Sequence, residues 1–139
     1  MRERIVLDAV KSGGGVEKVT LEPASRPPYE LDVTRAGRGR RSFAADNLFA
    51  CLLGARRELE GDGLLLCCQG ARLDVTNSGM QAQMTGGRFV YTFDPSSRVV
   101  NDETVDIFAP ADADQVATVE DQRKAIYAFF GIGGRGDSR

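Results

Sequence analysis

Four polar residues lie close together in one short segment, and their types could bind an anion or take part in catalysis. They are Arg72, Asp74, Ser78 and Arg88. A short helix predicted between the two arginines would offer free backbone N–H groups and the positive end of its dipole to a phosphate or carboxylate. Alternatively, Asp74 could pair with the arginines in an internal network that fixes this helix to a sheet. We favour the internal network, with external anion binding second and catalysis third.

The sequence contains no histidine, which restricts the catalytic chemistry available to it. The Ser-His-Asp and Cys-His constellations need an imidazole, as does the commonest general base near neutral pH. The three cysteines, Cys51, Cys67 and Cys68, are too few for a four-thiolate zinc site, and their number and adjacency argue against a disulfide framework. We interpret at least two of them as small core residues of a cytoplasmic protein, we predict no metal and no cofactor, and we favour a non-catalytic role over an enzymatic one.

Charge is distributed unevenly along a chain whose net charge is only −2. Residues 94–121 carry eight acidic residues against one basic residue. Such a segment is either a solvated face or a surface that binds a basic partner. The candidate partner-binding residues are Asp102, Glu103, Asp106, Asp112 and Asp114.

The segment RAGRGRR at residues 35–41 has four arginines and two glycines, a composition that predicts a mobile basic loop. Nucleic-acid binding through this loop is not favoured, because the chain is acidic overall and lacks interleaved aromatic residues. No apolar run approaches the roughly 18–20 residues needed to span a bilayer, so no membrane partner is expected.

The elements that must position these residues follow from hydrophobic periodicity. In the first half, strands are predicted at 4–10, 17–23 and 29–34, the first two forming a hairpin, and an apolar central strand at 64–68. Between them, a long helix beginning near Ser42 carries an apolar stripe, with Arg56 lying away from it. The stripe consists of Leu48, Cys51, Leu52, Ala55 and Leu59. Gly61 and Gly63 are expected to end this helix.

In the second half, a short helix is predicted within residues 77–85, followed by strands at 88–93 and 102–108 and a C-terminal helix at 119–130. Met80 and Met84 lie four residues apart and are expected to pack the short helix onto the sheet, or else to form an adaptable partner surface. Thr118 is the expected N-cap of the last helix. Its predicted buried face comprises Val119, Ile126, Phe129 and Phe130.

These elements predict an α+β fold: a mainly antiparallel sheet of five or six strands, one long central helix, a short helix in the polar segment and a C-terminal helix. A parallel pairing of the strands on either side of residues 77–85 is the main alternative. We expect a single domain over residues 1–130 and a flexible tail at 131–139.

The polar segment also resembles the central motif of a small, poorly characterised bacterial family. The residues that carry the resemblance there are Cys68, Gly70-Ala71-Arg72, Asp74-Val75, Ser78-Gly79-Met80, Met84, Gly86-Gly87-Arg88 and Tyr91. The likeness extends to Asp46-Asn47-Leu48-Phe49, Val105-Asp106-Ile107-Phe108 and Val119-Glu120-Asp121-Gln122-Arg123, and thus covers about residues 46–130. Thr76-Asn77 and Phe89 depart from the family pattern, which has an aromatic residue and a proline at the first site and a lysine at the second.

Proteins of this family tend to be encoded beside polymorphic or contact-dependent toxins, and they offer no established catalytic residues. The resemblance therefore implies an immunity protein, a non-catalytic inhibitor that neutralises a cognate toxin by binding it. The alternative is a small-anion or nucleotide-binding domain, with or without catalytic activity, that uses Arg72, Ser78 and Arg88.

Overall fold

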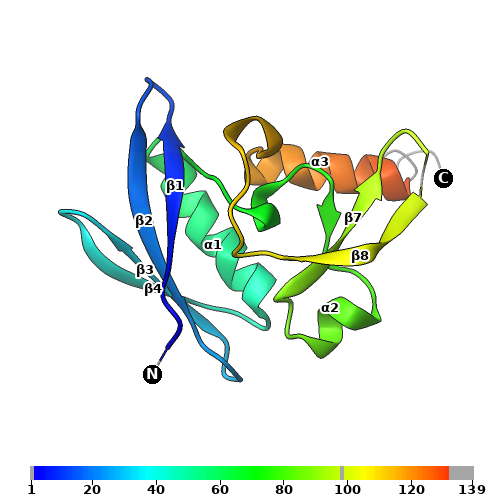
Figure 1. Ribbon diagram of the computed structural model, residues 1–139, viewed down its shortest axis with the longest axis horizontal. Coiled ribbons are helices and arrows are strands. Elements are labelled where there is room, and N and C mark those ends of the chain that lie inside the picture. Colours follow the sequence, from blue (N-terminus) through cyan, green and yellow to red (C-terminus); the bar gives the residue numbers. More distant parts are fainter. Residues whose placement is uncertain (1, 98, 132–139) are drawn as a thin grey trace.

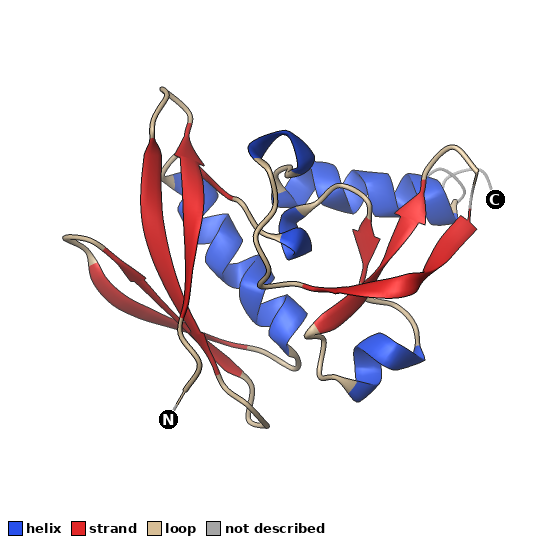
Figure 2. Cartoon of the chain, in the orientation of Figure 1, coloured by secondary structure: helices blue, strands red, loops and turns tan. Residues whose placement is uncertain are grey.

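The computed structural model describes residues 2–97 and 99–131, and within them the fold is α+β, as predicted (Figures 1 and 2). A five-stranded antiparallel sheet has the order β4-β3-β2-β1-β5, and a three-stranded antiparallel sheet has the order β6-β7-β8. The first half contains β1 (Ile5–Lys11), β2 (Val16–Pro23), β3 (Glu30–Arg35), β4 (Gly39–Ala44), α1 (Leu48–Gly61) and β5 (Leu64–Leu66). The second half contains β6 (Val75–Thr76), α2 (Met80–Met84), β7 (Phe89–Asp94), β8 (Val99–Asp106) and α3 (Val119–Phe130), with 3-10 turns η1 (Gln69–Ala71) and η2 (Ala113–Gln115).

The first sheet begins with the predicted hairpin of β1 and β2, in which Ile5 pairs with Leu21. β5 pairs with β1 at the edge of this sheet, so the prediction of a central strand at 64–68 is wrong in position. The strand is apolar because it packs against α1, and its Leu64 and Leu66 side chains are buried in the core cluster that also contains Ile107 and Phe108.

The segment at 35–41 is not a mobile loop, because it forms the tight turn between β3 and β4. Gly37 and Gly39 adopt φ values of +77° and +76°, and Arg41 pairs with Val33 across the hairpin. Its arginines are held by carboxylates of the same sheet and of α1: Arg35 bonds Glu17 and Asp62, Arg38 and Arg40 lie 3.6 Å from Asp62 and Asp32, and Arg41 lies 3.0 Å from Glu58. A strand was missed here because its charged side chains hide the alternation.

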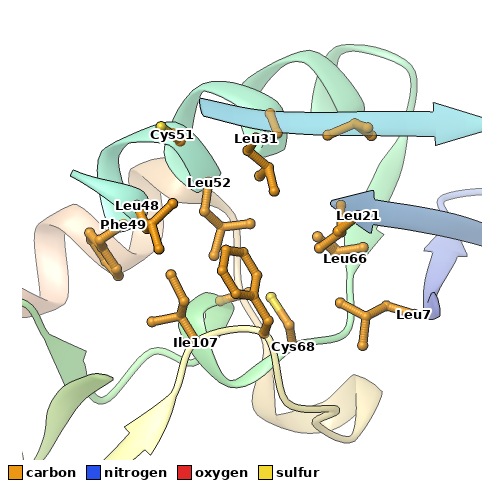
Figure 3. Close-up of a cluster of buried hydrophobic side chains, with 14 of the residues drawn as sticks. Leu7, Leu21, Leu31, Leu48, Phe49, Cys51, Leu52, Leu66, Cys68 and Ile107 are labelled. Atoms are coloured by element: carbon orange, nitrogen blue, oxygen red, sulfur yellow. The ribbon is translucent and has the colours of Figure 1, made fainter. Parts of the chain in front are cut away.

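The long helix α1 begins five residues later than predicted, because its N-cap is Asn47 rather than Ser42. Ser42 lies in β4 and donates to Asp32 Oδ1 at 2.6 Å, whereas Asn47 is the N-cap and accepts from the backbone N–H of Ala50 at 2.8 Å. The predicted apolar stripe is confirmed, since all five of its residues are buried. In Figure 3, Leu48 and Leu52 of this stripe face Ile107 and Cys68, so α1 is packed between the two sheets in one continuous core.

The second sheet was expected to be part of the first, and its strands pair antiparallel rather than parallel on either side of residues 77–85. The pairing of β7 with β8 has a register shift between Tyr91 and Phe93, and the rings of these two residues contact different helices. The Tyr91 ring lies against Gly79 at the start of α2, and the Phe93 ring lies 4.3 Å from that of Phe129 in α3. The expected Thr118 cap is confirmed, with the Asp121 N–H donating to it at 3.1 Å.

Three apolar residues expected in the core are exposed instead. Met80 and Met84 are 74% and 75% exposed, because the five-residue helix α2 buries Ala82 on its inner side. Met84 lines an open surface cleft of about 390 Å³ between α2 and the loop that follows β2. Phe130 is 39% exposed, and Gln122 takes the inward position on α3 instead.

The predicted tail at 131–139 lies outside the described residues except for Gly131, which caps α3 in the left-handed conformation. Among the described helices, none has the length and apolar character needed to cross a bilayer.

Candidate functional site

Arg72 and Asp74 form the internal pair that the sequence suggested. Arg72 donates from Nε and Nη2 to the two carboxylate oxygens of Asp74 at 2.9 and 2.8 Å, and from Nη1 to Gln69 Oε1 at 2.8 Å. This bidentate salt bridge, called the Arg72–Asp74 fork below, joins η1 to the residues that precede β6 and does not reach α2. Ser78 is not part of it, because its hydroxyl lies 3.0 Å from that of Thr76.

Arg88 belongs to a separate cluster at the start of β7. It bonds both oxygens of Asp106 at 2.7 and 2.9 Å and both oxygens of Glu3 at 2.8 and 3.1 Å, and its guanidinium lies 5.0 Å from the centre of the Phe108 ring. The hydrogen bonds that Arg88 donates to Asp106 and, to a lesser extent, to Glu3 raise its pKa above the ordinary value. Arg88 thus ties the N-terminal segment to the end of β8 and occupies Asp106, one of the five candidate partner-binding residues.

The structure does not bring Arg72, Ser78 and Arg88 together around one anion. The carbonyl of Asp74 accepts from the Phe93 N–H near the end of β7, whereas Arg88 precedes the first residue of that strand. Five strand residues at about 3.3 Å each separate these points by roughly 16 Å. Moreover, both guanidinium groups already bind carboxylates, so an external anion would have to displace them.

The Arg72–Asp74 fork is only partly buried, with side chains 20% and 33% exposed, and this sets the expected cost of breaking it. We expect Asp74→Asn to lower the free energy of unfolding by about 1 kcal/mol, not by the roughly 3–5 kcal/mol of a fully buried pair. Urea denaturation measures this difference. Asp46→Asn is a matched control, because Asp46 is exposed and has no ion pair among residues 2–97 and 99–131. A loss of about 3 kcal/mol or more would show that the fork contributes more to the free energy of unfolding than its exposure indicates.

The most buried polar residues form a network that the sequence pattern does not indicate. Arg56 and Gln122 are each 1% exposed, and Arg56 Nη1 donates to Gln122 Oε1 at 2.7 Å. Gln122 Nε2 in turn donates to the carbonyls of Gly70 at 2.8 Å and Arg72 at 2.7 Å. This network therefore joins α1, η1 and α3.

Arg56 is held by further oxygen atoms on its other side. Its Nη2 donates to the carbonyl of Ala117 at 2.8 Å and lies 3.8 Å from Glu60 Oε2, and the Glu60 carboxylate accepts from the Val119 N–H at 3.1 Å. Burial lowers the pKa of Arg56, partly opposed by Glu60, and its Nε atom has no hydrogen-bond partner among the described residues. The earlier prediction that Arg56 lies away from the apolar stripe is wrong: it stands four residues after Leu52 and seven after Phe49, both buried.

All three thiols are buried, whereas the sequence predicts a core position for at least two of them. Cys51, Cys67 and Cys68 are free and buried. Burial raises the pKa of each of them, and for Cys68 to about 11, which disfavours the nucleophilic thiolate. Over residues 2–97 and 99–131 no cluster of three or more potential ligands from His, Cys, Asp and Glu is placed to hold a metal ion.

The candidate partner-binding residues occupy two neighbouring parts of the chain. Asp102, Glu103 and Asp106 lie on β8, whereas Asp112 and Asp114 lie at η2. Asp112 caps η2 by accepting from the Gln115 N–H. All except Asp106 are exposed, and none of these four has an ion-pair partner within the described chain.

Comparison with known proteins assigns no family. No protein-family model matches the sequence, and no curated protein matches it.

Proposed function

We propose that this domain is a non-catalytic, cytoplasmic protein-binding inhibitor of the immunity type, which neutralises a cognate bacterial toxin by binding it. One observation carries the proposal: nearly all carboxylates in the first part of the chain form ion pairs, whereas several on one later segment have no cation partner among the described residues. Within residues 2–93, Asp46 alone among the acidic residues has no ion pair. On β8 and η2, by contrast, Asp102, Glu103, Asp112 and Asp114 face solvent and have no ion-pair partner among residues 2–97 and 99–131.

Unpaired carboxylates repel one another in the free protein and are relieved when a basic surface covers them. Toxins that act on nucleic acids present positively charged clefts to their substrates. An acidic surface would be steered into such a cleft and would block it. The alternative, a small-anion or nucleotide-binding domain, would require Arg72 or Arg88 to give up bonded carboxylates, and no observation favours that exchange.

Replacing both Asp112 and Asp114 with asparagine is expected to slow association with the toxin. Asparagine at 112 can still cap η2, so the fold should be retained. We expect the association rate constant to fall by about threefold to tenfold at low salt, and the wild-type rate to fall as salt rises, because exposed charges are screened over about 8–10 Å. The measurement is association kinetics over a salt series with the protein encoded by the adjacent gene, and Asp46→Asn serves as the control.

Two results would count against this proposal in different ways. If a tight complex formed with an association rate that changed neither with salt nor with the two substitutions, η2 would not be part of the interface. The absence of any complex with the product of an adjacent toxin gene would exclude the immunity function itself.

A further inference from the structure

The strand β8 forms an open edge of the second sheet. It pairs with β7 on one side and is the last strand in the order β6-β7-β8 (Figure 1). Its first five residues are all exposed, and they include two apolar side chains, Val99 at 53% and Val100 at 40%. An edge strand presents unpaired backbone groups to which another extended chain can bind.

The direction of the backbone groups follows from the register. The Ile107 N–H donates to the carbonyl of Arg88 at 2.9 Å, and Val90 pairs with Val105 and Tyr91 with Thr104 without a break. Backbone groups of alternate residues point to the same side in an antiparallel ladder, so Val105 also points to β7. Thr104 therefore points its N–H and C=O away from β7, and neither group bonds to another described segment.

The charges along this edge identify what it can bind. A second copy of β8 would bring Asp102 and Glu103 against the same carboxylates, and like charges across a strand pair are destabilising. A basic segment would instead pair its cations with them. We propose that β8 binds an extended, basic segment of a partner protein as an added strand, with apolar residues of that segment packing near Val99 and Val100.

This inference rests on the proposed function, since the toxin would supply the added strand, but it makes a separate claim about how binding occurs. Strand addition depends on backbone hydrogen bonds, whereas electrostatic attraction alone does not. The probe is a synthetic peptide of alternating lysine and valine. Its controls are the same peptide with N-methyl groups on alternate backbone amides, which keeps the charge, and a peptide of alternating glutamate and valine.

We expect the Lys-Val peptide to bind and to slow hydrogen exchange of the Thr104 amide, and we expect neither control peptide to do so. Thr104→Pro should weaken this binding by about tenfold or more. Proline removes the N–H that points away from β7, and no hydrogen bond to β7 is lost. Thr104→Val keeps that N–H and should bind within about twofold of the wild type. Circular dichroism and the urea midpoint verify that both variants are folded.

The inference would be overturned if the N-methylated peptide bound as well as the parent, if Thr104→Pro and Thr104→Val bound alike, or if no peptide bound. The peptide experiment does not involve the toxin. A negative result therefore rejects strand addition and leaves the immunity function to its own test, while a toxin that fails to bind rejects the immunity function without affecting the peptide result.

Discussion

Replacing Gln122 with leucine is expected to destabilise the domain by about 3–5 kcal/mol, a large part of the stability of a small domain. The side chain is almost fully buried and makes three hydrogen bonds, one of them to the charged Arg56. Leucine has a similar size, so little of the loss should come from a cavity. The cost arises because the buried guanidinium and the Gly70 and Arg72 carbonyls lose partners that water cannot replace.

Urea denaturation of the leucine variant provides the measurement, with Lys124→Leu as the control on the same helix. Lys124 is exposed, so its replacement should change the free energy of unfolding by no more than about 0.5 kcal/mol. If the two variants unfolded alike, the network would contribute little to stability.

Arg56→Met separates the buried charge from its hydrogen bonds. Methionine removes the charge together with its need for partners, so we expect this variant to lose less stability than Gln122→Leu. The double variant should also be more stable than Gln122→Leu alone, because no guanidinium remains unpaired. If Arg56→Met proved the more damaging single change, the arginine would contribute through packing and its bonds to Glu60 and Ala117 more than through its pairing with Gln122.

The contrast between Arg56 and the rest of α1 shows which structural features local sequence patterns can predict. The apolar stripe of that helix and the Thr118 cap of α3 were predicted because both depend on residues three to four positions apart. Arg56 occupies the same side of the helix, but a charged residue is assigned to solvent unless its partners are known. Those partners, Gln122 and the Ala117 carbonyl, are more than sixty residues away in the sequence.

The candidate site shows the same limit. The types of Arg72 and Asp74 predicted their pairing, since they are two residues apart and geometrically suited to a fork. Nothing in the local sequence indicated that Arg88 would instead bind Glu3 and Asp106, because that depends on the length of β7 and on the path of the N-terminal segment. The division into two sheets was hidden for the same reason, since it is set by which strands meet.

The glycine pair after α2 approaches the start of α1, and this explains a motif that sequence alone placed only at a helix end. The Leu48 N–H donates to the Gly86 carbonyl at 2.7 Å, and the Gly87 N–H donates to the Ala82 carbonyl at 2.8 Å. A Cβ atom on Gly87 would lie 2.9 Å from Asn47 Oδ1 and 3.0 Å from the Phe49 nitrogen, closer than side chains approach such atoms. The cap of α1 is therefore packed directly on this turn.

Gly87→Ala is accordingly expected to lower the free energy of unfolding by about 3–4 kcal/mol, from a left-handed backbone and a close contact together. Gly37→Ala isolates the first contribution, because Gly37 has a similar φ of +77°, against +86° at Gly87, and no atom within 4 Å of the added Cβ. That control should cost only about 1–2 kcal/mol. Thermal or urea denaturation of both variants gives the difference, which measures the packing of the turn against α1. Equal losses would contradict the structural role, and if Gly87→Ala also abolished partner binding, the glycine pair would belong to the interface instead.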